Sequence, residues 1–275
     1  MSYYRSLGLS REPFSTSPDP DFFYRSSSHI TALKRLEIAI RLRRGMSLII
    51  GDVGTGKTTL WRALTQEFRD EPEFAFHVML DPGFGTEGQF LRALDGMFGA
   101  DGGQEGSTDP KIPLEKYLFR KGVDENGTVV LIIDEGQKLN AANIETLRTL
   151  LNYETNEHKL LQLVIMAQVE ILPRIAGMKN FTDRISLKYT LNPLDEEETR
   201  EMICFRLRQA GYKRRFDLFT PAAVKAVYAR SGGYPRKINL LCHEALKTAV
   251  VREKDVIDEG IVEEILLPTF EYEQR

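Results

Sequence analysis

The segment from Ser47 to Leu60, which reads SLIIGDVGTGKTTL, limits the possible folds of this chain more than any other. It matches G-x-x-x-x-G-K-[ST], with the fixed places taken by Gly51, Gly56, Lys57 and Thr58. The apolar run before the motif predicts a buried strand, and the residues after it have helical apolar spacing. A glycine-rich loop between a strand and a helix surrounds a phosphate with N–H groups, and the helix N-terminus adds positive charge. The segment therefore predicts a P-loop nucleoside triphosphatase rather than a glycine-rich turn without a ligand.

The loop residues have distinct expected partners on ATP. Lys57 is long enough to reach the outer phosphates, and the Thr58 hydroxyl is suited to bind Mg²⁺. We expect nucleotide contacts along the whole loop, from Gly51, Asp52, Val53, Gly54, Thr55, Gly56, Lys57, Thr58 and Thr59.

A second motif, VVLIIDE, covers Val129 to Glu135. Its apolar β-formers predict a strand buried on both faces, as in the centre of a parallel sheet. Ligands bind at the carboxyl edge of such sheets, so Asp134 is placed to hold Mg²⁺ through its water shell. Glu135 can then polarise the water that attacks the γ-phosphate. Acidic residues often end strands, so this motif gains its meaning from its pairing with the P-loop.

Three further apolar runs predict strands, at residues 74–80, 160–167 and 186–191. Helical segments between them indicate an α/β fold with a five-stranded parallel sheet. Gln168 directly follows the run at 160–167, which is the fourth predicted strand in chain order. Its amide either holds the attacking water and senses the γ-phosphate, or only caps the strand.

The pattern changes at Asn192-Pro193, after which helices are expected at 196–210, 221–231, 236–252 and 258–267. We therefore expect an α/β nucleotide-binding domain at 27–192 and a helical lid at 193–275. Residues 1–26 are rich in proline and aromatic residues, which predicts an extended arm packed on the core. Arg236 and Lys237 lie at a helix start, where cations are disfavoured unless an anion is near.

The net charge of the chain is -3, from 37 Lys and Arg residues and 40 Asp and Glu residues. This balance argues against a protein that binds nucleic acid through its overall charge. Two cysteines without C-x-x-C spacing argue against zinc. The absence of a long apolar run predicts a cytoplasmic protein without a membrane span. Double-stranded DNA remains a possible partner through a basic helix face or a basic cluster, although such a face is usually only solvated. These residues are Lys34, Arg35, Arg41, Arg43 and Arg44, and Lys213, Arg214 and Arg215.

Several segments together give the chain a family resemblance. These are LSREPF at residues 9–14, SPDPDFFY at 17–24, IDEGQKL at 133–139 and LLNYET at 150–155, along with the P-loop and GYPR. The order resembles the AAA+ ATPases, and more closely the ATPase domain of the general secretion pathway protein A, or ExeA-like, group. The resemblance covers nearly the whole chain.

This resemblance implies roles that spacing leaves open. Gln168 takes the place of the sensor on the fourth strand, and Arg236 that of the second sensor, which reaches the γ-phosphate. Arg184 takes the place of the arginine finger that enters a neighbouring subunit's site, with Arg174 as the alternative. A finger supplied in trans implies a homo-oligomer, either a ring or an open helix.

The resemblance also implies a biological role. A Mg-ATP-dependent ATPase of this group drives assembly of a secretion, pilus or polysaccharide-export complex through an inner-membrane or envelope partner. Relatives of this type usually continue past the lid into a transmembrane segment, so we expect an excised domain or a stand-alone member, at the inner face of the membrane. The alternative is a regulator of transposition target selection that polymerises on double-stranded DNA.

Overall fold

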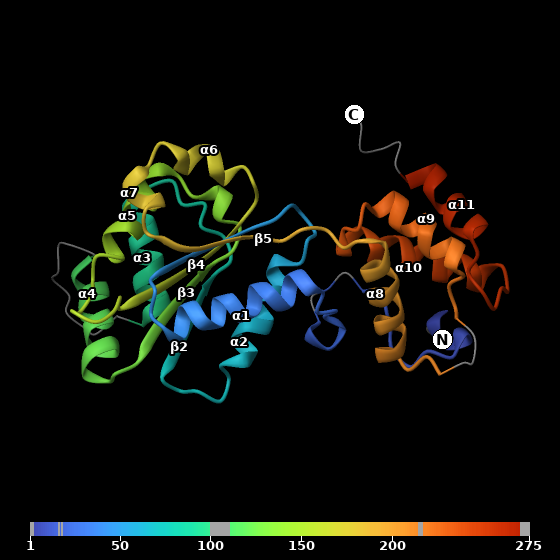
Figure 1. Ribbon diagram of the computed structural model, residues 1–275, viewed down its shortest axis with the longest axis horizontal. Coiled ribbons are helices and arrows are strands. Elements are labelled where there is room, and N and C mark those ends of the chain that lie inside the picture. The colour runs from blue at the N-terminus through green and yellow to red at the C-terminus, as the bar shows by residue number, and fades with distance from the viewer. Residues whose placement is uncertain (1–2, 16, 18, 100–110, 214–216, 270–275) are drawn as a thin grey trace. The chain divides into compact units, whose positions relative to one another are not determined.

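A computed structural model describes residues 3–15, 17, 19–99, 111–213 and 217–269 of the chain (Figure 1). The chain divides into two compact units. The α/β unit consists of Ser28–Val53 and Leu60–Leu191. The helical unit consists of Met1–Ser27, Gly54–Thr59 and Asn192–Arg275.

Five parallel strands form the sheet of the α/β unit, in the order β2-β3-β4-β1-β5. This confirms the predicted five-stranded parallel sheet. Every residue of β1, β3 and β4 is buried, because these adjacent inner strands are covered on both faces. In β5 half-buried residues alternate with exposed ones, as at a sheet edge. The strands are β1 (Met46–Ile50), β2 (Phe74–Met79), β3 (Thr128–Ile133), β4 (Leu161–Ala167) and β5 (Ile185–Thr190).

Helices cover both faces of this sheet (Figure 1). One face carries α1 (Ser27–Arg41) and α2 (Lys57–Glu67). The other carries α3 (Glu87–Phe98), α4 (Lys111–Phe119), α5 (Ala141–Leu150), α6 (Ile171–Ala176) and α7 (Lys179–Thr182). Alternate strand residues such as Leu131 and Ile133 join these last five helices in one hydrophobic cluster. Two short turns complete the unit, the π-helical η3 (Arg120–Asp124) and the 3₁₀ turn η4 (Gly136–Lys138).

The helix α4 has no counterpart among the elements expected from the sequence. Its third residue is Pro113, which usually signals a break. In the first turn of a helix, however, a proline costs no hydrogen bond, since the N–H groups there have no intrahelical partner. Leu114, Tyr117 and Leu118 then reach the core cluster.

The helical unit contains α8 (Glu196–Gln209), α9 (Pro221–Ser231), α10 (Pro235–Val251) and α11 (Glu259–Thr269). These bounds match the predicted helices to within two residues at either end. A capping box fixes the start of α8, where Asp195 accepts from the N–H of Glu198 and the Glu198 side chain accepts from that of Asp195.

The N-terminal arm differs from our expectation. It contains two 3₁₀ turns, η1 (Tyr3–Leu7) and η2 (Pro20–Phe22). Among the described residues, its buried apolar side chains do not join the core of the α/β unit. Instead Leu7, Leu9, Phe14 and Phe22 lie in the hydrophobic core of the helical unit. Composition showed that these side chains need a cover, but it could not show which core supplies it.

Candidate active site

The P-loop has the predicted strand–loop–helix setting. It leaves the end of β1 at Gly51, whose N–H donates to the carbonyl of Ala167 at 3.1 Å. Gly54 and Gly56 have positive φ angles of 83° and 97°, which side chains disfavour. Lys57 is the first residue of α2 and only 7% of its surface is exposed. The loop therefore has the glycine conformations and the sheltered lysine that a phosphate cradle requires.

Gly54–Thr59 are grouped with the helical unit, and within that unit they meet the start of α10. The N–H of Arg236 donates to the carbonyl of Gly54 at 3.3 Å. A Cβ added at Gly54 would lie 3.0 Å from the Cβ of Arg236. Arg236, expected as the second sensor, is thus beside the loop expected to hold the phosphates.

Asp134 directly follows β3 and is only 4% exposed. Its N–H donates to the carbonyl of Met79 at 2.9 Å. Each carboxylate oxygen also accepts a hydrogen bond, since Oδ2 accepts from the indole Nε1 of Trp61 at 3.0 Å and Oδ1 from the N–H of Glu135 at 3.0 Å. Both partners donate, so they fix the direction of the carboxylate, and carboxylate oxygens are ligands that suit a divalent cation.

Glu135 has left-handed backbone angles, φ 54° and ψ 37°, and precedes η4. Its Oε2 atom accepts from the amide Nε2 of Gln137 at 2.5 Å and lies 3.5 Å from the amide Nε2 of Gln168. The Oε1 atom of Gln137 accepts from the N–H of Gln168 at 3.1 Å. Three polar side chains thus form one small network at the end of the sheet, and sequence reasoning found two of them.

These residues share one edge of the sheet. Gly51, Asp134 and Gln168 directly follow β1, β3 and β4, and β4 lies between the other two strands. Parallel strands bring their carboxyl ends to the same edge, where α/β proteins bind ligands. The predicted residues of the α/β unit are therefore gathered at one place by the strand order.

Comparisons with known proteins agree with this geometry. Residues 40–175 match the family model described as "AAA domain". The chain is 35% identical over 260 residues to general secretion pathway protein A of Aeromonas hydrophila, a match that covers 94% of this chain. The chain belongs to the AAA+ ATPases, in the group of general secretion pathway protein A. It spans 47% of the length of that relative.

Solved structures show the same AAA+ fold. One is the ORC2 protein of Aeropyrum pernix in ADPNP and ADP complexes, with a TM-score of 0.68 at 16% identity, which covers 94% of this chain and 72% of that one. Another is Drosophila ORC bound to DNA, with a TM-score of 0.67 at 22% identity, which covers 94% and 65% of the two chains. At these identities the likeness concerns the fold alone.

The two arginines considered for the AAA+ arginine finger differ in their surroundings. Arg174 in α6 donates from Nη1 to the carbonyl of Leu139 at 3.0 Å, directly after η4. Arg184 follows α7 and donates from Nε to the carbonyl of Asn180 at 3.2 Å. Among the described residues, the two terminal nitrogens of Arg184 make no hydrogen bond. Arg174 is therefore occupied within its own subunit, whereas Arg184 keeps the two donors that a finger uses.

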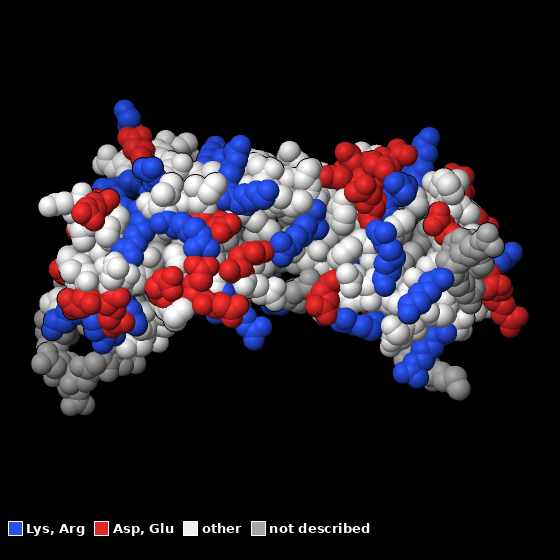
Figure 2. Space-filling model, turned by 60° about the horizontal axis from the view of Figure 1, so that its bottom comes forward, with Lys and Arg blue, Asp and Glu red and all other residues white. Residues whose placement is uncertain are grey.

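Two cations of the basic set in and after α1 have partners inside this AAA+ chain. Arg41 pairs with Glu37 and Glu71, at 2.9 and 2.6 Å. Arg43 donates to the Thr128 hydroxyl and to the carbonyl of Asn126, both at 3.0 Å. Figure 2 shows Lys and Arg side chains interspersed with Asp and Glu on the face it presents. Such a face lacks the single-sign field that steers DNA.

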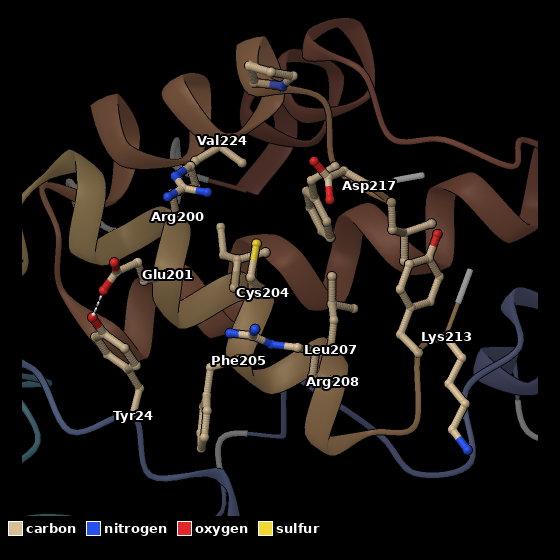
Figure 3. A pocket seen from close by; sticks show the side chains of 15 residues that line it. Tyr24, Arg200, Glu201, Cys204, Phe205, Leu207, Arg208, Lys213, Asp217 and Val224 are labelled. Atoms are coloured by element: carbon tan, nitrogen blue, oxygen red, sulfur yellow. Dashed lines mark hydrogen bonds between the residues drawn. The ribbon is translucent and has the colours of Figure 1, made fainter. Parts of the chain in front are cut away.

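In the second basic cluster, Lys213 lines a cavity of the helical unit and residues 214–216 lie outside the described residues. The cavity has a volume of about 710 Å³ and is lined mainly from α8, with Tyr24 of the arm at one end (Figure 3). The Tyr24 hydroxyl donates to Glu201 at 2.6 Å. Burial raises the pKa of the Cys204 thiol in its wall, so this cysteine is not an activated nucleophile. None of the predicted catalytic residues lines this cavity.

Within the part of the chain that the structure describes, no helix is long and apolar enough to cross a bilayer.

Proposed function

We propose that this AAA+ chain binds Mg-ATP at the carboxyl edge of its sheet and hydrolyses it there. The observation that carries this proposal is the joint placement of Gly51, Asp134 and Gln168 after adjacent strands, with Glu135 in the same network. A P-loop alone would bind a nucleotide. A carboxylate network at the same edge adds the means to activate water.

Each residue has a proposed task. Lys57 and the N–H groups of Gly54 and Gly56 bind the β- and γ-phosphates. Thr58 and the buried Asp134 would hold Mg²⁺, because this ion takes few protein oxygens and completes its shell with water and phosphate oxygens. When bound, the ion neutralises part of the phosphate charge. Glu135 orients the attacking water and accepts its proton. Gln168 and Arg236 each serve as a sensor of the γ-phosphate.

The proposed biological role rests on the relative's name, general secretion pathway protein A. The chain would act in the cytoplasm as a homo-oligomer, a ring or open helix, in which Arg184 of one subunit completes the site of the next. Turnover would then change subunit packing and drive assembly of a secretion, pilus or polysaccharide-export complex. The partner would be an inner-membrane or envelope protein that holds the ATPase at the inner face of the membrane.

Two variants test the proposed chemistry. Lys57→Ala is expected to abolish nucleotide binding, because the principal cation of the cradle is lost. Glu135→Gln is expected to bind ATP normally but to hydrolyse it about 10²- to 10⁴-fold more slowly, the usual contribution of a general base. Trp61, the single tryptophan, donates to Asp134, so we expect its fluorescence to change when Mg-ATP binds.

The matched control is Glu145→Gln, since Glu145 is an exposed acid on α5 whose ion pair is with Arg148 of the same helix. It is expected to leave turnover unchanged. Near-normal hydrolysis by Glu135→Gln would exclude Glu135 as the base. Imaging with and without double-stranded DNA tests the biological role, and assemblies that need DNA would contradict it.

A further inference from the structure

The turn after β3 contains an amide that the proposed chemistry leaves unused. Gln137 lies two residues after Glu135, within η4. Its Nε2 donates to Oε2 of Glu135 at 2.5 Å, and its Oε1 accepts from the N–H of Gln168 at 3.1 Å. One side chain therefore links the proposed base, which lies just after β3, to the proposed sensor, which directly follows β4.

These bonds constrain the Glu135 carboxylate unequally. Oε2 has amide groups of Gln137 and Gln168 at 2.5 and 3.5 Å. Oε1 accepts no hydrogen bond from the described residues. A carboxylate anchored through one oxygen presents the other in a fixed direction, which is the arrangement needed to orient a water molecule.

The turn that carries Gln137 is itself firmly seated. A Cβ added at Gly136 would lie 2.4 Å from Cγ2 of Ile165, so the backbone lies directly on β4. The guanidinium of Arg174 also donates from Nη1 to the carbonyl of Leu139 at 3.0 Å, directly after the turn. Gln137 thus transmits the position of a supported backbone to Glu135, rather than following a mobile side chain.

We propose that Gln137 is a positioning residue for ATP hydrolysis, which fixes the Glu135 carboxylate and couples it to Gln168. This inference rests on the proposed function. Since the Gln168 N–H is held by the same amide that holds the base, a displacement of the β4 end on γ-phosphate binding or release moves the carboxylate with it. Gln137 needs no contact with ATP for this role.

The test uses Gln137→Met, which keeps most of the side-chain volume and removes both hydrogen bonds, and Gln137→Ala as a second variant. We expect kcat to fall about 10- to 100-fold, the effect of a misplaced catalytic group. We expect the KM for ATP and Trp61-detected binding to stay within about twofold, since nucleotide contacts are untouched. In a Glu135→Gln background, either variant should cause no further loss.

Lys138→Ala is the matched control, because it alters the next residue of the same turn and removes only an exposed ion pair. It should retain the rate. A Gln137→Met protein with normal kcat beside an inactive Glu135→Gln protein would overturn this inference alone. Equal rate losses from Gln137→Met in both backgrounds would show a general structural role and would also overturn it. Absence of Lys57-dependent hydrolysis in the unaltered chain would instead overturn the proposed function, and this inference with it.

Discussion

At the scale of the residue, Gly136 shows how tightly the candidate site is built. The Cβ of an alanine at this position would lie 2.4 Å from Cγ2 of Ile165 and 3.2 Å from the carbonyl oxygen of Met166. Both belong to β4, which is buried and cannot retreat without loss of packing. We predict that Gly136→Ala lowers the free energy of unfolding by about 1–3 kcal/mol, as overpacking does. Chemical denaturation measures this.

The control for this prediction is Gly96→Ala, in α3. A Cβ there meets nothing within 4 Å, so the substitution only replaces glycine by a better helix former. It should raise the free energy of unfolding by about 0.5–1 kcal/mol. Equal effects of the two substitutions would show that the turn can move away from β4.

The sequence predicted the residues of this site whose position follows directly from a strand end. Asp134 and Gln168 are the first residues after apolar runs, and strand order alone brings such residues together. It did not indicate Gln137, because the left-handed turn at Glu135 that folds the amide back is invisible in apolar spacing. The sequence signal that could have indicated Gln137 is an amide residue placed two positions after Glu135 and directly after a glycine, Gly136.

At the scale of the element, Arg206 of α8 explains why the N-terminal arm belongs to the helical unit. Arg206 is 7% exposed, and its guanidinium donates to the carbonyls of Pro13, Phe22 and Ser15 at 2.7, 3.0 and 3.0 Å. Burial lowers its pKa to about 10, so it stays charged at neutral pH. The planar fork of arginine satisfies three separate carbonyls, which a lysine ammonium cannot do in this geometry.

We therefore predict that Arg206→Lys lowers the free energy of unfolding by about 2–4 kcal/mol, since charge-assisted hydrogen bonds are lost. Proteolysis should also cleave the arm between Pro13 and Phe22 much faster. Arg208→Lys serves as the control, because Arg208 lies on the same helix and makes no hydrogen bond to the described residues of the arm. An arm equally protected in both variants would show that the apolar contacts of Phe14 and Phe22 hold it alone.

The arm and α4 mark the limit of sequence prediction at this scale. Periodicity gave the helices of both units, because amphipathic spacing depends only on neighbours along the chain. The core against which the arm packs depends on hydrogen bonds between arm carbonyls, such as that of Pro13, and Arg206, which is far away in the sequence. In α4, Pro113 obscured a helix whose first turn accepts it.

At the scale of the whole molecule, we predict that a second subunit completes the site, because the two terminal nitrogens of Arg184 make no hydrogen bond among the described residues. Arg174 already donates to the carbonyl of Leu139 in the same chain, so its loss should impair the site of the same subunit. Arg184→Ala and Lys57→Ala should each be inactive alone, and activity of the unaltered protein should rise with its concentration. In an equal mixture, an Arg184→Ala subunit keeps its P-loop and can receive Arg184 from a Lys57→Ala neighbour. With random head-to-tail assembly, roughly a quarter of the sites are then complete, and ATPase activity should return to about that fraction.

The same mixing experiment with Arg174→Ala supplies the control. If Arg174 supports η4 within its own subunit, a Lys57→Ala neighbour cannot replace it, and the mixture should remain as slow as its components. Recovery with Arg174→Ala but not with Arg184→Ala would assign the finger to Arg174. Recovery with neither variant, at concentrations where the unaltered protein is active, would show that each subunit completes its own site. The ATPase site of this chain would then need no neighbour, and coupling between nucleotide and assembly would have to pass through the helical unit alone.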